Sequence, residues 1–103
     1  MKEVKAVIQP HRMDAVLSAL HHIGNLPLVV AGEAEGIDTA PGMYEQHRMV
    51  KIELMVPDDL VETVVGAIAE AAHTGNPGDG RIFVIPIEES IVIRSGERGE
   101  KAR

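Results

Sequence analysis

The amino-acid sequence predicts an α+β fold of the ferredoxin-like class (βαβ-βαβ), an antiparallel sheet with two helices on one face. Three observations lead to this prediction. Two runs of alternating apolar residues are each stopped by a proline and followed by apolar residues at helical spacing. Each helical segment is followed by a Gly-Asn pair and then by a β-rich run. With 103 residues, of which 45% are hydrophobic, the chain is expected to form a single domain, 1–103.

The first unit begins with a strand in which apolar and polar residues alternate, with Val4, Ala6 and Ile8 on one face. Pro10 ends this strand. The helix that follows is predicted from apolar residues at helical spacing, namely Met13, Val16, Leu17, Leu20 and Ile23. Gly24-Asn25 is typical of a helix end, and the run 28–31 predicts the next strand.

The second unit repeats this pattern. Its strand is predicted from the alternating residues Val50, Ile52, Leu54 and Val56, and Pro57 ends it. Asp59 and Glu62 suggest a capping box for a helix. The apolar face of this helix comprises Leu60, Val61, Val64, Val65, Ile68 and Ala72, and the helix is expected to end at Gly75-Asn76. A strand at 81–86 and a last short strand at 90–94 complete the prediction.

Three further expectations concern the parts outside the two units. The connection 33–48 contains glycines and a proline without periodicity, so it is predicted to be a functional or mobile loop. The charged segment 95–103 is predicted to be a flexible C-terminal tail. Two helices cover only one face of the sheet, so the other face is expected to be covered by further copies of the chain.

Composition excludes several classes of protein. Sixteen acidic against ten basic residues give a net charge of −6, which argues against a nucleic-acid partner. The chain has no cysteine, so disulfides and thiolate metal sites are excluded. No apolar run is long enough to span a membrane, and a cytoplasmic protein is the expectation. No serine or threonine stands in the context of a catalytic nucleophile with its base, so the chain is not expected to be an enzyme.

The glycine-rich segment TGNPGDGRIFVIP, residues 74–86, has two interpretations. It is either a turn that leads into a strand or a cradle for the oxygen atoms of an anion. In the second case Gly78, Asp79 and Gly80 supply the loop, Arg81 pairs with phosphate oxygens, and Arg94 adds a second cation. Replacement of Gly80 by valine would then weaken binding by filling the space where the backbone meets the anion. A purely structural turn predicts unfolding instead.

The segment 74–99, TGNPGDGRIFVIPIEESIVIRSGERG, closely resembles the C-terminal signature of the PII nitrogen-regulatory signalling proteins. The stretches VKAVIQP and VKIELMVPDDLVETVVGAI resemble the corresponding family segments, so that the resemblance covers nearly the whole chain apart from the connection. It implies a homotrimer that binds an adenine nucleotide (ATP, ADP or AMP) between subunits and controls a target protein, a transporter, enzyme or regulator. The nucleotide-binding residues that it implies are Val29, Gly36, Gly78, Asp79, Gly80, Arg81, Arg94 and Arg98.

The sequence departs from the family pattern at three places. The connecting loop is markedly shorter than the family T-loop and lacks the Gln-Lys element that holds 2-oxoglutarate beside the nucleotide's magnesium, so the role of Mg stays open. Met49 replaces a family lysine. Val92 stands where the family has a second arginine on the last strand, which predicts that ADP or AMP competes well against ATP.

Alternatives remain open at several residues. His47, with Glu45 or Asp38, is a candidate metal site, and the protein would then be a metal-responsive PII-like protein linked to heavy-metal efflux or tolerance. Tyr44 is a candidate for covalent modification, or it anchors the loop by packing. Arg98 either contacts phosphate or belongs to a solvated tail.

Overall fold

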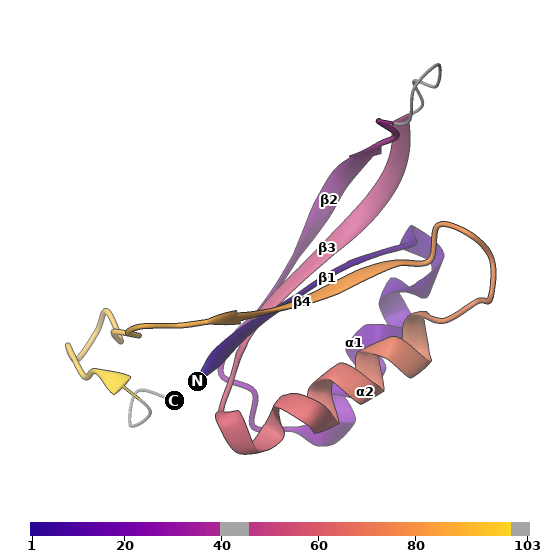
Figure 1. The fold of residues 1–103 in the computed structure, drawn as a ribbon. Helices are drawn as coiled ribbons and strands as arrows, with labels where there is room; N and C mark the ends of the chain where they lie inside the picture. The colour runs from indigo at the N-terminus through magenta and orange to yellow at the C-terminus, as the bar shows by residue number, and fades with distance from the viewer. Residues whose placement is uncertain (40–45, 100–103) are drawn as a thin grey trace.

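A computed structural model of the protein describes residues 1–39 and 46–99. Two helices cover one face of a four-stranded antiparallel sheet with strand order β2-β3-β1-β4 (Figure 1), which confirms the predicted ferredoxin-like fold. In chain order the elements are β1 (Lys2–Ile8), η1 (Pro10–Arg12), α1 (Met13–Ile23), β2 (Val29–Ile37), β3 (Gln46–Val56), η2 (Asp58–Leu60), α2 (Val61–Ala72) and β4 (Gly80–Pro86).

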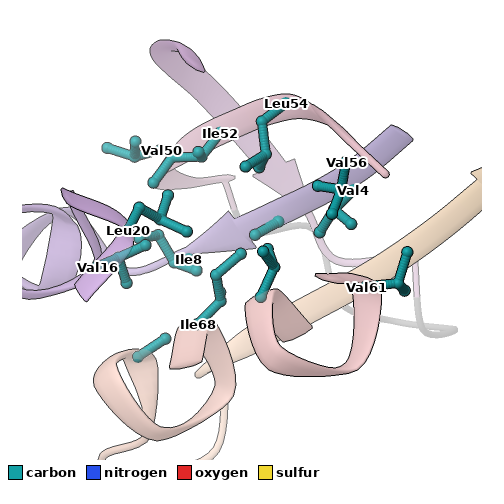
Figure 2. Packing of buried hydrophobic residues seen from close by; sticks show 13 residues of the cluster. Val4, Ile8, Val16, Leu20, Val50, Ile52, Leu54, Val56, Val61 and Ile68 are labelled. Atoms are coloured by element: carbon teal, nitrogen blue, oxygen red, sulfur yellow. The ribbon is translucent and has the colours of Figure 1, made fainter. Parts of the chain in front are cut away.

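The core lies between the helices and the sheet face that they cover. Its sheet side comes from the alternating residues of β1 and β3, and its helix side comes from both helices (Figure 2). Buried residues include Val4, Ala6, Ile8, Val16, Leu20, Val50, Ile52, Leu54, Val56, Val64 and Ile68. The strand and helix patterns of the sequence therefore identified the core correctly, because the apolar side chains that they place on one face are buried in the same layer.

The strands of the hairpin run further than the sequence predicts. β2 continues to Ile37 and β3 begins at Gln46, so half of the predicted loop 33–48 is strand. Residues 34–37 and 46–49 pair with each other beyond the end of β1, and they form a two-stranded ribbon that projects from the sheet (Figure 1). Gly36 pairs with His47 in this ribbon. The sequence did not reveal these strands, because Met49 is the one buried hydrophobic residue among 34–37 and 46–49 and the segments show no apolar alternation.

The C-terminal segment differs from the two predictions made for it. Residues 90–94 form no strand beside the sheet; instead a single bridge joins Ile91 to Arg98. The amide of Val92 donates to the carbonyl of Glu97 and that of Gly99 to the carbonyl of Ser90, so the first part of the predicted tail is hydrogen-bonded. Residues 100–103 of that tail lie outside the described residues. In one copy of the chain this segment has no partner strand, and Ile93 is 99% exposed.

Two details of α2 also differ. The predicted capping box of Asp59 and Glu62 does not form: the N-cap residue is Leu60, without a side-chain cap, because a 3₁₀ turn precedes the helix. The helix ends at Ala72, earlier than the predicted Gly75-Asn76. The end of α1 is as predicted, with Gly24 at φ 71° and Asn25 at φ 57°.

Arg12, in η1, takes over the capping of the end of α2. Its Nε and Nη2 atoms donate to the carbonyl oxygen of Ala71 at 2.8 and 2.6 Å. A cation at a helix C-terminus satisfies a carbonyl that has no partner within the helix and complements the helix dipole. The turn between β1 and α1 thereby holds the end of α2, from which the glycine-rich segment starts.

We expect Arg12→Ala to lower the free energy of unfolding by about 1–2 kcal/mol, because a charged, part-buried donor to a helix carbonyl is lost. Arg12→Lys keeps the charge and one donor, so its loss should be smaller. Urea denaturation of the three proteins measures both effects. Equal stability of wild type and Arg12→Ala would contradict this role.

The sheet face away from the helices carries exposed apolar side chains. Val30, Phe83 and Ile85 are 50%, 44% and 37% exposed. The pairing places them on this face together with Lys5, Glu53 and Arg81, because directly opposed residues of neighbouring strands point the same way. No helix in the described part of the chain is long and apolar enough to cross a membrane.

Candidate phosphate-binding loop

The segment between α2 and β4 is an irregular loop that three glycines make feasible. Gly75, Gly78 and Gly80 have φ values of 86°, 91° and 109°, in the left-handed region that other residues avoid. Within it, Asn76-Pro77-Gly78-Asp79 has the sequence of a type II turn, with proline second and a positive-φ glycine third. The Gly78 N–H finds no acceptor among residues 1–39 and 46–99, so it remains available to a ligand.

Asp79 shapes this loop from within. One carboxylate oxygen accepts the N–H groups of Thr74 and Gly75 at 2.8 and 3.0 Å, and the other accepts the hydroxyl of Thr74. His73 Nδ1 lies 3.7 Å from the same carboxylate. These hydrogen bonds, the Thr74 hydroxyl first, hold the pKa of Asp79 below its ordinary value. The side chain of Asp79 is thus engaged by the loop itself, whereas the sequence interpretation assigned it to the nucleotide.

A titration tests the Asp79 interactions. Because the folded pKa is lowered, the hydrogen bonds stabilise the loop above about pH 3.9, the ordinary aspartate pKa. They are lost as the pH falls through the lower folded value. We expect Thr74→Val to raise the pKa of Asp79 toward the ordinary value in a carbon-13 NMR titration. An unchanged pKa in that variant would show that the hydroxyl is not the main cause.

Gly80 is required for a different reason from the one that the sequence suggested. A Cβ atom at this position would lie 1.8 Å from the carbonyl oxygen of Val7 and 2.8 Å from its carbon. Gly80 opens β4 and pairs with Ile8, so the two backbones meet here more closely than any side chain permits. The glycine serves the contact between strands; the expectation that valine would fill an anion space is corrected accordingly.

Arg81 follows directly and forms no ion pair with any residue that the structure describes. It lines an open hollow of about 330 Å³ between the end of α2 and the start of β4, with Asp79 and His73 beside it. The floor of this hollow is apolar and is formed by Ile8, Ala69, Ala72 and Ile82. The hollow thus offers an apolar floor, with Arg81 at its rim and the arginine side chain on the sheet face away from the helices, and such an arrangement is suited to a ligand with an apolar and an anionic part.

The other predicted site residues lie elsewhere in the single chain. Val29 lines a second hollow of about 290 Å³ at the end of α1, beside the opposite edge strand β2. Arg94 and Arg98 follow the far end of β4, which is about 20 Å from its start by strand geometry. Arg98 is paired with Glu89 at 2.5 Å. Only Gly78, Asp79, Gly80 and Arg81 are brought together.

The ribbon has an apolar residue at the position where the family has a phosphate-facing lysine. Met49, which replaces the family lysine, is buried, and its Cγ would lie 3.2 Å from a Cβ at Gly36. In the described ranges no three His, Asp or Glu side chains gather to hold a metal ion, so His47 gains no cluster of ligands. Tyr44 and Glu45 lie outside the described residues.

One contact of the loop was not foreseen from the sequence. The Nε2 atom of Gln9 donates to the carbonyl oxygen of Gly78 at 2.5 Å. Gln9 stands 69 positions before Gly78, and only the pairing of Ile8 with Gly80 brings the two together. No local pattern marks such a residue; the register of β1 against β4 is the signal that would have found it.

Comparison with known proteins assigns the chain to a family. The sequence profile of the nitrogen regulatory protein P-II family matches residues 1–97. The chain belongs to the P-II family. A P-II protein of Rhodospirillum rubrum is 46% identical and one of Azospirillum brasilense is 43% identical, each over 99% of both chains.

A solved P-II structure agrees with the fold. The crystal structure of Arabidopsis thaliana PII bound to citrate superposes with a TM-score of 0.87 at 40% identity, over 99% of this chain and 91% of that one. The two bacterial alignments span 112 positions against 103 residues in this chain, so those P-II relatives carry residues that it lacks. This difference in length is in keeping with its short connection between β2 and β3.

Proposed function

We propose that this P-II protein is a signalling regulator in nitrogen metabolism, not an enzyme, and that it binds the phosphates of an adenine nucleotide between copies of the chain. The observation that carries the proposal is the loop 74–81. It carries the unpartnered N–H of Gly78 and the unpaired guanidinium of Arg81, and its residues Asp79, Gly80 and Arg81 line a ligand-sized hollow. Backbone donors and an arginine fork are the groups that bind phosphate oxygens.

The separation of the predicted residues favours a site shared between subunits. Arg81 lies on edge strand β4 and Val29 on edge strand β2, with two strands between them, about 14 Å in all. A copy that brings its β2 edge and C-terminal segment to the β4 edge of its neighbour would unite both halves. Such a head-to-tail contact is heterologous, and it closes into a ring when the rotation permits.

A trimeric ring, as the family resemblance implies, also accounts for the uncovered sheet face. That face exposes Val30, Phe83 and Ile85, which would be buried around the axis of the ring. Burial of apolar area of this kind is the main source of stability in assemblies of subunits. The same ring would cover Ile93, which one copy leaves almost fully exposed.

The cations available to the phosphates are few. Arg81 and Arg94 have no ion pair within the described ranges, whereas Arg98 is engaged by Glu89. Two guanidinium groups match the charge of AMP or ADP better than that of ATP without a metal ion. We infer that ADP or AMP competes effectively with ATP, and that the output is the binding of a target protein.

Isothermal titration with ATP, ADP and AMP, each with and without magnesium, tests this function, together with light scattering for the oligomeric state. Binding of ADP with up to one site per chain by a trimer supports the proposal. The absence of binding at millimolar nucleotide in all six titrations overturns it, and so does a stable monomer at micromolar concentration. Histidine-dependent binding of zinc or copper without nucleotide binding would favour the metal-responsive alternative.

A further inference from the structure

Gln9 lies where β1 meets the phosphate-binding loop. It follows Ile8, the last residue of β1, and precedes the 3₁₀ turn that leads into α1. The hydrogen bond from its side-chain amide to the Gly78 carbonyl joins β1 to the loop apex. A Cβ at Gly78 would lie 3.4 Å from the same amide nitrogen, so that the two residues are in direct contact.

Besides Gln9, two other residues hold the loop. Arg12 holds the carbonyl of Ala71 at its beginning, and the Asp79 carboxylate holds Thr74 and Gly75 in its first part. Within the turn 76–79 the N–H of Asp79 faces the carbonyl of Asn76. The carbonyl oxygen of the same peptide, between Gly78 and Asp79, has no partner in either contact, and a glycine at a positive φ leaves its direction weakly fixed.

The hydrogen bond from Gln9 fixes the direction of this carbonyl oxygen. A trans peptide directs its C=O and N–H in opposite directions. With the Gly78 carbonyl turned toward Gln9, the N–H of Asp79 points away from β1. An unheld peptide could turn its carbonyl oxygen outward instead, and a carbonyl oxygen repels phosphate where an N–H attracts it.

We propose that Gln9 is a positioning residue for phosphate binding: by holding the Gly78 carbonyl it keeps the oxygen of the loop apex turned toward β1 and leaves the N–H of Gly78 available to the phosphates of the nucleotide. This inference rests on the proposed function, whose ligand it makes more specific. It predicts that replacing Gln9 weakens the binding of nucleotides through their phosphates and leaves the affinity for adenosine unchanged.

Two variants separate the hydrogen bond from the bulk of the side chain. Gln9→Met keeps nearly the same length without a donor, and Gln9→Glu donates only when its carboxyl group is protonated. Gln46→Met, the same change at an exposed residue of the ribbon, serves as the control. Each protein is titrated with ADP and with adenosine, and the amide signals of residues 78–80 are recorded by nitrogen-15 NMR without ligand.

We expect Gln9→Met to bind ADP roughly three- to tenfold more weakly than wild type, the loss of one neutral hydrogen bond. Adenosine binding should be unchanged, and the free protein should show shifted, faster-exchanging amides at residues 78–80. At pH 7.5 Gln9→Glu should bind ADP more weakly than Gln9→Met, because its carboxylate adds a negative charge near the phosphates, and it should gain ADP affinity relative to Gln9→Met as the pH is lowered and the carboxyl group becomes a donor. The ratio of the two ADP affinities, taken at each pH, removes the effects of pH that both variants share.

The outcomes distinguish this inference from the proposed function. If wild type binds no ADP, the proposed function fails and the ligand role of Gln9 fails with it. If wild type binds ADP and Gln9→Met binds it equally well, only the role of Gln9 is overturned. Equal losses for ADP and adenosine would also overturn it, because they would indicate a general structural effect.

Discussion

Gly80→Val is expected to destabilise the protein by about 3 kcal/mol or more in the absence of any ligand. The new side chain would have to displace the carbonyl of Val7, which lies 1.8 Å from the position of the Cβ atom. The φ of 109° adds backbone strain for any residue other than glycine. Strain of this kind costs on the order of 1–3 kcal/mol, and overpacking costs a similar amount.

The matched control is Gly32→Val. Gly32 also lies in a strand, β2, but a Cβ there meets no atom within 4 Å. We expect its free energy of unfolding to stay within about 0.5 kcal/mol of wild type. Urea denaturation without nucleotide compares the three proteins. If Gly80→Val were as stable as Gly32→Val, the close contact between β1 and β4 would be refuted.

Arg81→Ala should lower the affinity for ADP by about ten- to a hundredfold, since hydrogen bonds from a charged group contribute about 1.5–3 kcal/mol. Stability should change little, because Arg81 forms no ion pair within the described part of the chain. Titration calorimetry measures the affinity and urea denaturation the stability. Gly80→Val and Arg81→Ala therefore distinguish an effect on folding from an effect on binding at two adjacent positions.

Arg81→Lys is the control for Arg81→Ala, because it keeps the charge but not the two-pronged geometry of the guanidinium group. An intermediate loss is expected for it. Adenosine, which has no phosphate, should bind all three proteins alike. An undiminished ADP affinity in Arg81→Ala would remove this residue from the site.

The sequence predicted the fold because both of its periodic patterns point into one core. Val4, Ala6 and Ile8 alternate, and Val16 and Leu20 repeat at helical spacing, as a single buried layer requires. The ribbon beyond residue 33 was missed because Met49 is its one buried hydrophobic residue and it carries no such alternation. The strand predicted at 90–94 needs a neighbouring strand, which one copy of the chain does not offer.

The site was predicted only in part, for a related reason. The glycine loop and Arg81 are contiguous in sequence, so a local motif is enough to find them. The motif does not show which of its residues bind a ligand and which are structural. Asp79 accepts hydrogen bonds within the loop, and Gly80 permits the close approach of the β1 backbone. The contact of Gln9 with the loop depends on the register of β1 against β4, which a local pattern does not encode. In the proposed ring, the meeting of Val29 and Arg81 depends on a second copy of the chain.

The most direct test of the shared site is a mixed oligomer of two binding-deficient chains. Arg81 lies at the start of β4 and Arg94 follows its far end, and replacement of either arginine by alanine should weaken ADP binding. If one subunit supplies Arg81 and its neighbour supplies Arg94, each mixed oligomer contains a cleft with both arginines intact. Co-expression with two different affinity tags, followed by titration of the doubly purified species with ADP, is then expected to recover wild-type affinity at a fraction of the sites. Mixed oligomers that bind ADP no better than either parent would contradict a site formed between subunits.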